Sequence, residues 1–593
     1  MHIEGQPMPY RNPWIRSFLV LLCAMIGLEA GEWRGWWVDA FHPGMKTPAE
    51  VSTLVAQARQ AGINTLFVQV RKRGDALYSS TLEPKATDVS PPTFDPLAEL
   101  LRLAHDASSG QQRIDVHAWI VTYNIWNSET RQPSQANHPY RLHPDWLTES
   151  WDGSRWDGSN YAFDPAHPEV QDYTVAVALD LLRYDIDGLH LDYVRYNGSS
   201  WGYHPIALQR FQSLHGYTTR PSTSEAGWKQ FRRDQVTALL RRIHLASIQR
   251  KPSLRISAAT ITFAPGINST TQWTSTAAYG EVFQDWRAWM AEGLLDLNIP
   301  MAYFRQGANG ADWSAWSTFA KNHRYGRHVA LGVATYLNSP SDSLHQLRST
   351  RVATAAGGSA QGMVLYSYAD PSSDIIPTAQ FGAGLRTGFT GDSSVPLFST
   401  TEDPPNMPWK DSPQLGHLLG RLQGTDGATI LVAGTSAREL KTDANGWFGC
   451  LGLPPGEVRI TAQIPNRPML ATVRIQPGKV AQPTFWNPHS DDDGDGLSNG
   501  DELLWGSNPN QPSELPTARV EYRETRPCIT FPHGPMGREF VLWHTQEIRA
   551  GSPWLEVHRQ TTRPDEPAPI LDLSPWLLSD SMGFFRIEIR WVP

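Results

Sequence analysis

Cysteine is scarce in this chain, with three residues among 593. Cys23 lies in an apolar segment near the N-terminus, whereas Cys450 and Cys528 fall in regions that we expect to form different domains. A framework of disulfide bonds is therefore not indicated.

Long apolar runs are also missing. The longest, residues 17–28, is too short to cross a bilayer comfortably. Because Arg11 and Arg16 precede it and Ala30 offers a small residue for cleavage, residues 1–30 are predicted to be a signal peptide. The protein is then expected to be exported to the periplasm, the cell surface or the medium. Lipoprotein cleavage before Cys23 is a less favoured alternative.

Blocks of basic charge are absent as well, and the net charge is −8. This balance argues against a nucleic acid partner, because such proteins carry clustered Lys and Arg. The chain does hold 24 tryptophans. Most are expected in the core, but a flat indole is also a good surface for the apolar face of a sugar ring.

Short apolar strands alternate with helical stretches through the first two thirds of the chain. Eight strands are predicted, at residues 34–39, 65–71, 115–121, 188–193, 255–261, 296–303, 328–336 and 362–368. Eight such strands over some 340 residues predict an α/β fold of the (β/α)8 barrel type, spanning residues 31–390. An open doubly wound sheet is the alternative, disfavoured because no Gly-rich phosphate turn follows the first strand.

The first helix is clearly marked in the sequence. Thr47 is a candidate N-cap, Pro48 suits the first helical position, and Glu50 completes a capping-box pattern. Gly62 is expected to end the helix.

The rest of the chain is predicted to hold two small all-β sandwich domains. Residues 391–415 are rich in Pro, Ser and Thr and are expected to be a linker. Residues 416–486 form short alternating strands that resemble a carboxypeptidase-regulatory-like module. Residues 487–512 contain an acidic loop, and residues 513–593 are expected to form the C-terminal sandwich.

The fourth predicted strand is the most informative for chemistry. Asp192 stands near its C-terminal end, which is the face where barrel enzymes carry out their reactions. Its alternative role is an ion pair with a basic neighbour such as Arg195. His190, two residues earlier, either contacts substrate or simply holds Asp192 by a hydrogen bond.

The barrel region resembles glycosyl-hydrolase-like family 10. The matching segments, read from the sequence, are Arg34-Gly35-Trp36-Trp37, Gly74-Asp75-Ala76-Leu77-Tyr78, Val116-His117-Ala118-Trp119, Phe163-Asp164-Pro165 and the strand that carries Asp192. The resemblance implies a barrel that hydrolyses glycosidic bonds, with a polysaccharide or the peptidoglycan glycan as substrate.

Two departures from related patterns matter. Val121 stands where the family often has Asn, and Asn124 lies nearby as a possible substitute. The fourth strand also resembles the chitinase-type D-G-x-D-x-D-x-E strand, but Val194 occupies the position of the acidic Glu and His190 replaces an Asp. Chitinase-type chemistry by that Glu is therefore excluded.

Glycoside hydrolysis usually needs two carboxyl groups, about 5–10 Å apart, or one carboxyl group together with an acetamido group of the substrate. Asp192 is one, as general acid or nucleophile, and the second is open between Asp39, Asp75, Glu281 and Asp285. We expect Asp192 in an open cleft with Arg71 and Tyr303 nearby. The candidate sugar-binding residues are Gln69, Arg71, Trp37, Trp119, Asn124, His190, Arg195 and Tyr303.

The acidic loop fits the calcium pattern D-x-D-x-D-G-x5-E without a mismatch. Side chains of Asp491, Asp493, Asp495 and Glu502 and the carbonyl of Leu497 are the expected ligands, with Asn499 binding directly or through water. Pro488 argues against a long incoming helix, so the loop resembles a single thrombospondin type 3 or dockerin-like repeat. The calcium is expected to be structural, and no cofactor is expected in catalysis.

Three functions remain open from the sequence. The first is an exported glycoside hydrolase, and the second is a catalytically degenerate glycan-binding surface protein. The third is a cell-surface scaffold built on the sandwiches and the calcium loop. The lack of an obvious second carboxylate keeps the second function open.

Overall fold

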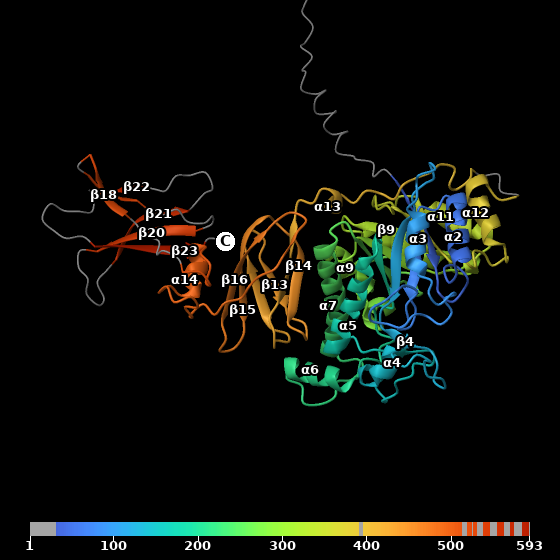
Figure 1. Ribbon diagram of the computed structural model, residues 1–593, viewed down its shortest axis with the longest axis horizontal. Helices are drawn as coiled ribbons and strands as arrows, with labels where there is room; N and C mark the ends of the chain where they lie inside the picture. The colour runs from blue at the N-terminus through green and yellow to red at the C-terminus, as the bar shows by residue number, and fades with distance from the viewer. Residues whose placement is uncertain are drawn as a thin grey trace, which may run out of the picture.

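The structure is a computed structural model that describes residues 31–390, 395–512, 519–524, 526–530, 538–545, 554–561, 570–573 and 584–591. The predicted signal peptide, with Cys23, lies outside these residues. Within them, no helix has both the length and the apolar character needed to cross a membrane. Figure 1 shows the barrel followed by two β-rich regions in a row.

Eight parallel strands close into a barrel in the order β1-β10-β9-β8-β7-β6-β3-β2. They are β1 Trp33–Val38, β2 Thr65–Arg71, β3 Asp115–Val121, β6 Gly188–Asp192, β7 Arg255–Ile261, β8 Leu297–Ala302, β9 His328–Ala334 and β10 Gly362–Tyr366. The predicted barrel is confirmed, and the closed order excludes the open doubly wound sheet.

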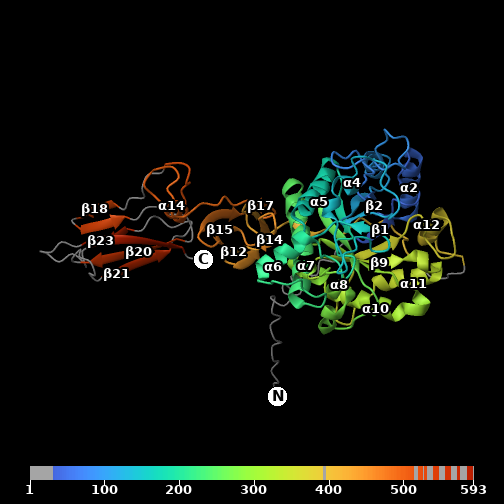
Figure 2. The same ribbon diagram turned by 90° about the horizontal axis from the view of Figure 1, so that it is seen from below.

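Helices surround the strands, as Figure 2 shows. The longer ones are α2 Pro48–Ala61, α3 Pro96–Ala104, α5 Pro168–Asp180, α7 Ala226–Arg250, α9 Trp286–Glu292, α10 Gln306–Asn322, α11 Pro340–Thr350 and α12 Thr378–Thr387. After β3 and β6 the chain makes long excursions that hold β4 Asn124–Trp126, α4 Pro139–Leu142, β5 Tyr161–Ala162 and α6 Pro205–His215. These excursions leave the C-terminal ends of the strands, the end at which barrel enzymes bind substrate.

The N-terminus of α2 forms as its sequence predicts, with one difference. The Thr47 hydroxyl accepts the Glu50 backbone N–H at 3.2 Å, and Gly62 ends the helix in a left-handed conformation. The Glu50 carboxylate, however, accepts the backbone N–H groups of Gly44 and Lys46 rather than that of Thr47. Glu50 therefore fixes the incoming loop instead of closing a capping box.

The interior of the barrel is filled by large apolar side chains, including Trp33, Trp37 and Phe67. At the N-terminal end of the strands this core includes Met407, which comes from the segment that the sequence marks as a linker. In the same segment, Trp409 donates to Asp296 at 2.7 Å and Lys410 forms an ion pair with Asp296 at 3.0 Å. Residues 407–411 therefore form a floor for the barrel.

The region after the floor forms two packed sheets, with orders β14-β11-β17 and β13-β12-β15-β16. Their strands are β11 Gly416–Arg421, β12 Thr429–Ala433, β13 Arg438–Lys441, β14 Trp447–Leu453, β15 Gly456–Gln463, β16 Met469–Ile475 and β17 Val480–Ala481. This domain contacts the barrel helices: the Arg210 guanidinium makes a two-pronged ion pair with Asp426 at 2.7 and 2.9 Å. Asn445 also donates to Asp172 of α5.

The C-terminal region begins with α14 Asn499–Trp505 and contains two further sheets, ordered β18-β19-β22 and β21-β20-β23. The strands are β18 Arg519–Arg523, β19 Arg526–Thr530, β20 Arg538–Thr545, β21 Leu555–Thr561, β22 Ile570–Asp572 and β23 Phe584–Trp591. Cys450 and Cys528 are buried in separate domains, each as a free thiol.

Candidate active site

A cleft of about 690 Å³ opens at the C-terminal mouth of the barrel. Its wall is mostly aromatic and aliphatic, with two carboxyl groups and one guanidinium. The lining residues are Trp37, Asp39, Phe41, Gln69, Trp119, Asp192, Tyr193, Arg195, Ala259, Ile261, Thr262, Phe263, Ala264, Met301, Tyr303, Phe304, Asn309, Tyr336 and Tyr366. An apolar concavity with a few converging polar groups is the usual form of a ligand site.

Asp192 is the last residue of β6 and lines this cleft while being almost wholly buried. Burial raises the pKa of its carboxyl group to about 6, against the opposing effects of the Arg195 guanidinium, the Tyr193 backbone N–H and the Trp119 indole. Asp192 Oδ1 accepts the Tyr193 N–H at 2.7 Å. Trp119 Nε1 faces the carboxyl group without completing a hydrogen bond. A carboxyl group with this pKa can hold or release a proton near neutral pH.

Asp39, directly after β1, supplies the second carboxyl group of the cleft. Its Oδ1 accepts the backbone N–H groups of Phe41 at 2.8 Å and His42 at 3.1 Å, and the His42 ring lies 2.9 Å away. Gln69 accepts the Ala40 N–H at 2.8 Å and so fixes the same turn. The structure therefore holds the Asp39 carboxylate rigidly in the cleft that contains Asp192.

Tyrosines form much of one wall. The rings of Tyr303 and Tyr366 stack at 5.4 Å, and Tyr336 packs edge-on against both. Burial raises the pKa of the Tyr366 hydroxyl, and the charges of Asp39 and Asp192 raise it further. Tyr366 lines the cleft together with both carboxyl groups.

The sequence predicts Tyr303 in the cleft, whereas Tyr366, Tyr193, Phe41 and Phe263 are found there only in the structure. In the sequence Tyr366 is one of several residues of the last predicted strand, and its place in the cleft becomes clear only from the closed barrel. The two phenylalanines are about half exposed at the cleft. Apolar residues in predicted loops after strands one and five were the available signal.

His190 lies beneath the cleft, not in it. Its Nε2 accepts the Trp37 indole N–H at 2.9 Å, and its Nδ1 lies 3.0 Å from Ser257 Oγ. Burial lowers its pKa well below the usual value. His190 thus holds Trp37, a floor residue of the cleft, and forms no hydrogen bond with Asp192.

Arg71 does not join the cleft, contrary to the sequence-based expectation. Its guanidinium is buried and makes a two-pronged ion pair with Glu83, with Nε 2.9 Å from both carboxylate oxygens. The pKa of Arg71 is raised, because the Glu83 carboxylate outweighs the opposite effect of burial. A register shift between Gln69 and Arg71 accompanies this change of direction.

The remaining carboxylate candidates also lie away from the lining residues. Asp285 is the N-cap of α9 and accepts the Trp273 indole N–H at 2.9 Å. Glu281 is exposed at the end of the short helix α8, Ala277–Gly280. Asp75 accepts the Arg73 N–H in the loop after β2. Asn124 is buried at the start of β4 and also lies outside the lining.

Arg195 brings the positive charge that Arg71 does not. Its guanidinium lies over the Tyr193 ring at 4.4 Å from the centroid, and its charge acts on Asp192 without an ion pair. The alternative in which Asp192 simply serves a salt bridge is therefore not supported by the geometry.

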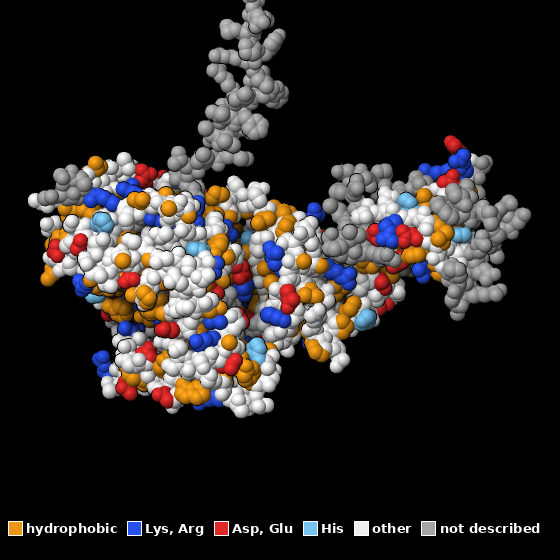
Figure 3. Space-filling model, turned by 180° about the vertical axis from the view of Figure 1, so that it is seen from behind, with side chains coloured by type: hydrophobic (Ala, Val, Ile, Leu, Met, Phe, Trp, Pro, Cys, Tyr) orange, Lys and Arg blue, Asp and Glu red, His pale blue; other side chains and the backbone are white. Residues whose placement is uncertain are grey.

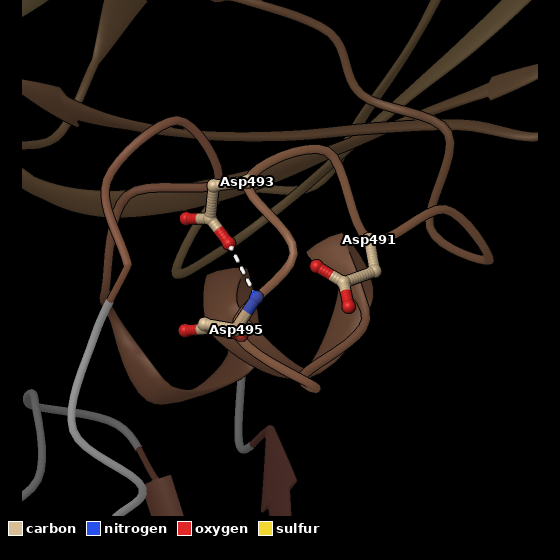
Figure 4. Close-up of side chains that lie close together, drawn as sticks. All are labelled: Asp491, Asp493 and Asp495. Carbon is tan, nitrogen blue, oxygen red and sulfur yellow. Dashed lines mark hydrogen bonds between the residues drawn. The ribbon is translucent and has the colours of Figure 1, made fainter.

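The acidic loop brings Asp491, Asp493 and Asp495 together, with one ligand atom of each within 4.8 Å of the others. Figure 4 shows the three carboxylates around the turn, with Asp493 accepting the Asp495 N–H. Asp493 Oδ2 and Glu502 Oε2 are buried without a hydrogen-bond partner. Burial and the neighbouring aspartates raise the pKa of Glu502. These oxygens fit a hard cation such as Ca²⁺.

Asn499 has another task in this loop. Its side-chain oxygen accepts the Asp492 N–H at 3.1 Å, and its amide donates to Asn487 at 3.0 Å. Direct ligation by this oxygen would compete with the first bond. The geometry therefore favours binding of Asn499 to the calcium ion through water over direct binding.

Two family models match parts of this chain. The model of the family described as glycosyl hydrolase-like 10 matches residues 32–341, and that of the bacterial TSP3 repeat matches residues 491–512. Glycosyl hydrolase YngK of Bacillus subtilis is 25% identical over 389 residues, covering 61% of this chain and 69% of YngK. Glycosyl hydrolase DigH of Escherichia coli K12 is 27% identical over 304 residues, covering 47% of this chain and 63% of DigH.

Solved structures also align with this chain. An endo-β-1,4-mannanase from Thermotoga petrophila covers 77% of this chain and 98% of its own, at 10% identity and a TM-score of 0.37. The catalytic domain of a β-amylase from Paenibacillus polymyxa covers 60% and 99%, at 11% identity and a TM-score of 0.40. The barrel itself follows from the strand pairing above.

Proposed function

This chain belongs to the glycosyl hydrolase-like 10 family, and we propose that it hydrolyses glycosidic bonds of a polysaccharide or cell-wall glycan in the cleft of Asp192. The observation that carries this proposal is a buried carboxyl group with a pKa near 6, facing a cleft that also contains Asp39. A glycosidase needs one carboxylic acid to protonate the leaving oxygen and one carboxylate opposite to it.

In this mechanism Asp192 is the general acid. Its burial keeps the proton on the carboxyl group until the glycosidic oxygen takes it. Asp39 then acts as base toward water or as nucleophile at the anomeric carbon, and its hydrogen bonds with the Phe41–His42 turn keep it oriented. Trp37 and the tyrosine wall offer flat surfaces to the sugar rings.

The test compares Asp192→Asn and Asp39→Asn in the full chain, with Asp285→Asn as matched control, since Asp285 caps a helix outside the cleft. Release of new reducing ends is measured on peptidoglycan strands and a panel of plant and algal polysaccharides. We expect both cleft variants to lose at least about 10³-fold in rate and the control to retain wild-type rate. Azide should restore turnover to Asp39→Ala, because the shortened side chain leaves room for the anion. Glycan binding without hydrolysis by the wild type would favour the binding-only function instead.

We also propose that the TSP3-type loop holds a structural Ca²⁺. The side chains of Asp491, Asp493, Asp495 and Glu502 and the Leu497 carbonyl would hold it, and its charge would relieve their mutual repulsion. The loop is distant in sequence from the cleft, so the ion is assigned to stability and not to hydrolysis.

Export of the chain is part of the same proposal. It is supported by the charged and apolar pattern of residues 1–30. A glycan partner agrees with the mixed surface charge: on the face seen in Figure 3, Lys and Arg lie interspersed with Asp and Glu.

A further inference from the structure

Arg195 is the one Lys or Arg among the described residues that line the cleft. Its Nε is buried and has no hydrogen-bond partner, and the described part of the chain offers its guanidinium no ion pair. A buried polar group without a partner costs free energy, most of all when it carries charge. A ligand that accepts hydrogen bonds from the Arg195 guanidinium would offset this cost.

The protein holds this side chain in place without using its N–H donors. The guanidinium rests on the face of Tyr193, and such cation–π contact fixes position while leaving the planar edge of the group open. Tyr193 itself adopts a φ of +49°, which a non-glycine residue rarely takes. Backbone strain of this kind persists mostly at functional sites.

Three buried arginines of this barrel each have at least one hydrogen-bond or ion-pair partner, although Arg232 Nη2 is also buried without one. Arg71 is paired with Glu83 and Arg210 with Asp426, and Arg232 donates to the Ser199 and Trp201 carbonyls. Arg195 differs from these three arginines, because no hydrogen bond or ion pair within the described residues holds its guanidinium.

We propose that Arg195 binds a carboxylate substituent of the glycan, which makes the cleft selective for acidic polysaccharides. The planar edge of a guanidinium matches the two oxygens of a carboxylate in a paired hydrogen bond. The Asp39 carboxylate repels an anion from its own side of the cleft, which favours the side of Arg195 for the acidic group. Phe41 and Phe263, about half exposed, remain for the apolar faces of flanking sugars.

This inference rests on the proposed glycan binding of the cleft, and its test avoids hydrolysis. Binding is measured by calorimetry with the full chain carrying Asp192→Asn. Two matched probe pairs are used: oligogalacturonates and their methyl esters, and peptidoglycan glycan strands before and after conversion of their carboxylates to methylamides. Arg195→Gln and Arg195→Lys are compared with Arg73→Gln, which removes the same charge beside Phe41 but outside the lining.

We expect the carboxylate form of at least one pair to bind about tenfold or more tightly than its neutral form. Arg195→Gln should abolish this preference, Arg195→Lys should keep part of it, and Arg73→Gln should keep it all. Equal binding within both pairs, absence of binding to all four probes, or a preference that survives Arg195→Gln overturns the inference. A preference without any hydrolysis by the wild type would instead retain the inference and refute the hydrolase.

Discussion

Trp37 donates its indole N–H to His190 Nε2 at 2.9 Å in the interior of the barrel. Because an indole can only donate, Nε2 must accept, and His190 therefore carries its proton on Nδ1, beside Ser257. Protonation of His190 would turn two donors toward each other. The position of Trp37 in the cleft therefore depends on a neutral His190 imidazole.

We expect the free energy of unfolding to fall as the pH drops below about 6.5. Burial lowers the pKa of His117, His244 and His328 to about 3 in each case. In the unfolded chain a histidine titrates near 6.5, so between these values the unfolded state binds more protons. Relative to its value above pH 6.5, the free energy of unfolding should be lower by about 2 kcal/mol per histidine at pH 5. Urea unfolding followed by tryptophan fluorescence at pH 7.5, 6 and 5 measures this. A flat profile would contradict it.

Asp192→Asn should stabilise the barrel at pH 7.5. The pKa of this carboxyl group is about 6 in the fold and 3.8 without it. Because the folded value is raised, ionisation costs about 3 kcal/mol at pH 7.5, and this cost falls below about 1 kcal/mol at pH 4. The gain of the variant over wild type in urea unfolding should shrink accordingly. A gain that is the same at both pH values would argue against an ionised, buried Asp192.

The pH profile of hydrolysis should report Asp192 directly. On a neutral substrate, kcat/KM is expected to fall above a pKa near 6, as the acid loses its proton. Arg195→Gln should move this alkaline limb to higher pH, because the Arg195 charge lowers the pKa of Asp192. Initial rates from pH 4 to 9 provide the test. A shift to lower pH would be the wrong sign for this assignment.

Glu83→Gln is expected to destabilise the barrel by about 3–5 kcal/mol, because it leaves the buried Arg71 guanidinium without its counter-charge. The double replacement Arg71→Met, Glu83→Leu removes both charges and should cost less. Urea unfolding of the two variants compares them. If Glu83→Gln unfolds like wild type but binds glycan weakly, Arg71 has a role in the cleft after all.

Glu502→Gln should abolish calcium binding, since Glu502 Oε2 is a buried oxygen without another partner. Calorimetric titration with Ca²⁺ and limited proteolysis with and without chelator measure the effect. Asp492→Asn is the matched control, because position two of the loop pattern points no ligand at the ion. Identical cleavage between residues 486 and 510 with and without chelator would rule out an ordering role.

The sequence predicts the barrel well because each strand is an apolar run with clear boundaries. All eight predicted strands appear, and those at 65–71, 115–121 and 255–261 match to the residue. Most of the differences lie at C-terminal strand ends, where residues such as Tyr193, Tyr303 and Tyr336 leave the sheet to line the cleft.

The site is harder to predict, because it depends on where each side chain is directed. Asp192, Asp39 and Tyr303 meet in the cleft as their strand-end positions suggest. Arg71 occupies an equivalent position in sequence, yet Glu83, twelve residues on, captures it. Helix capping likewise removes Asp285 from the candidates. Such local competition for a charged group leaves no periodic signal in the sequence.

Residues 407–411 close the N-terminal end of the barrel through Met407, Trp409 and the Lys410–Asp296 ion pair. A chain truncated at residue 390 would therefore have a barrel open at its N-terminal end, and the Asp296 carboxylate would lack its ion pair with Lys410. The stretch that the sequence marks as a linker is therefore in part a component of the barrel. A fusion of this barrel to another domain should therefore retain residues 407–411. It should also retain the first sandwich domain, because Asp426 of that domain forms an ion pair with Arg210 of the barrel region.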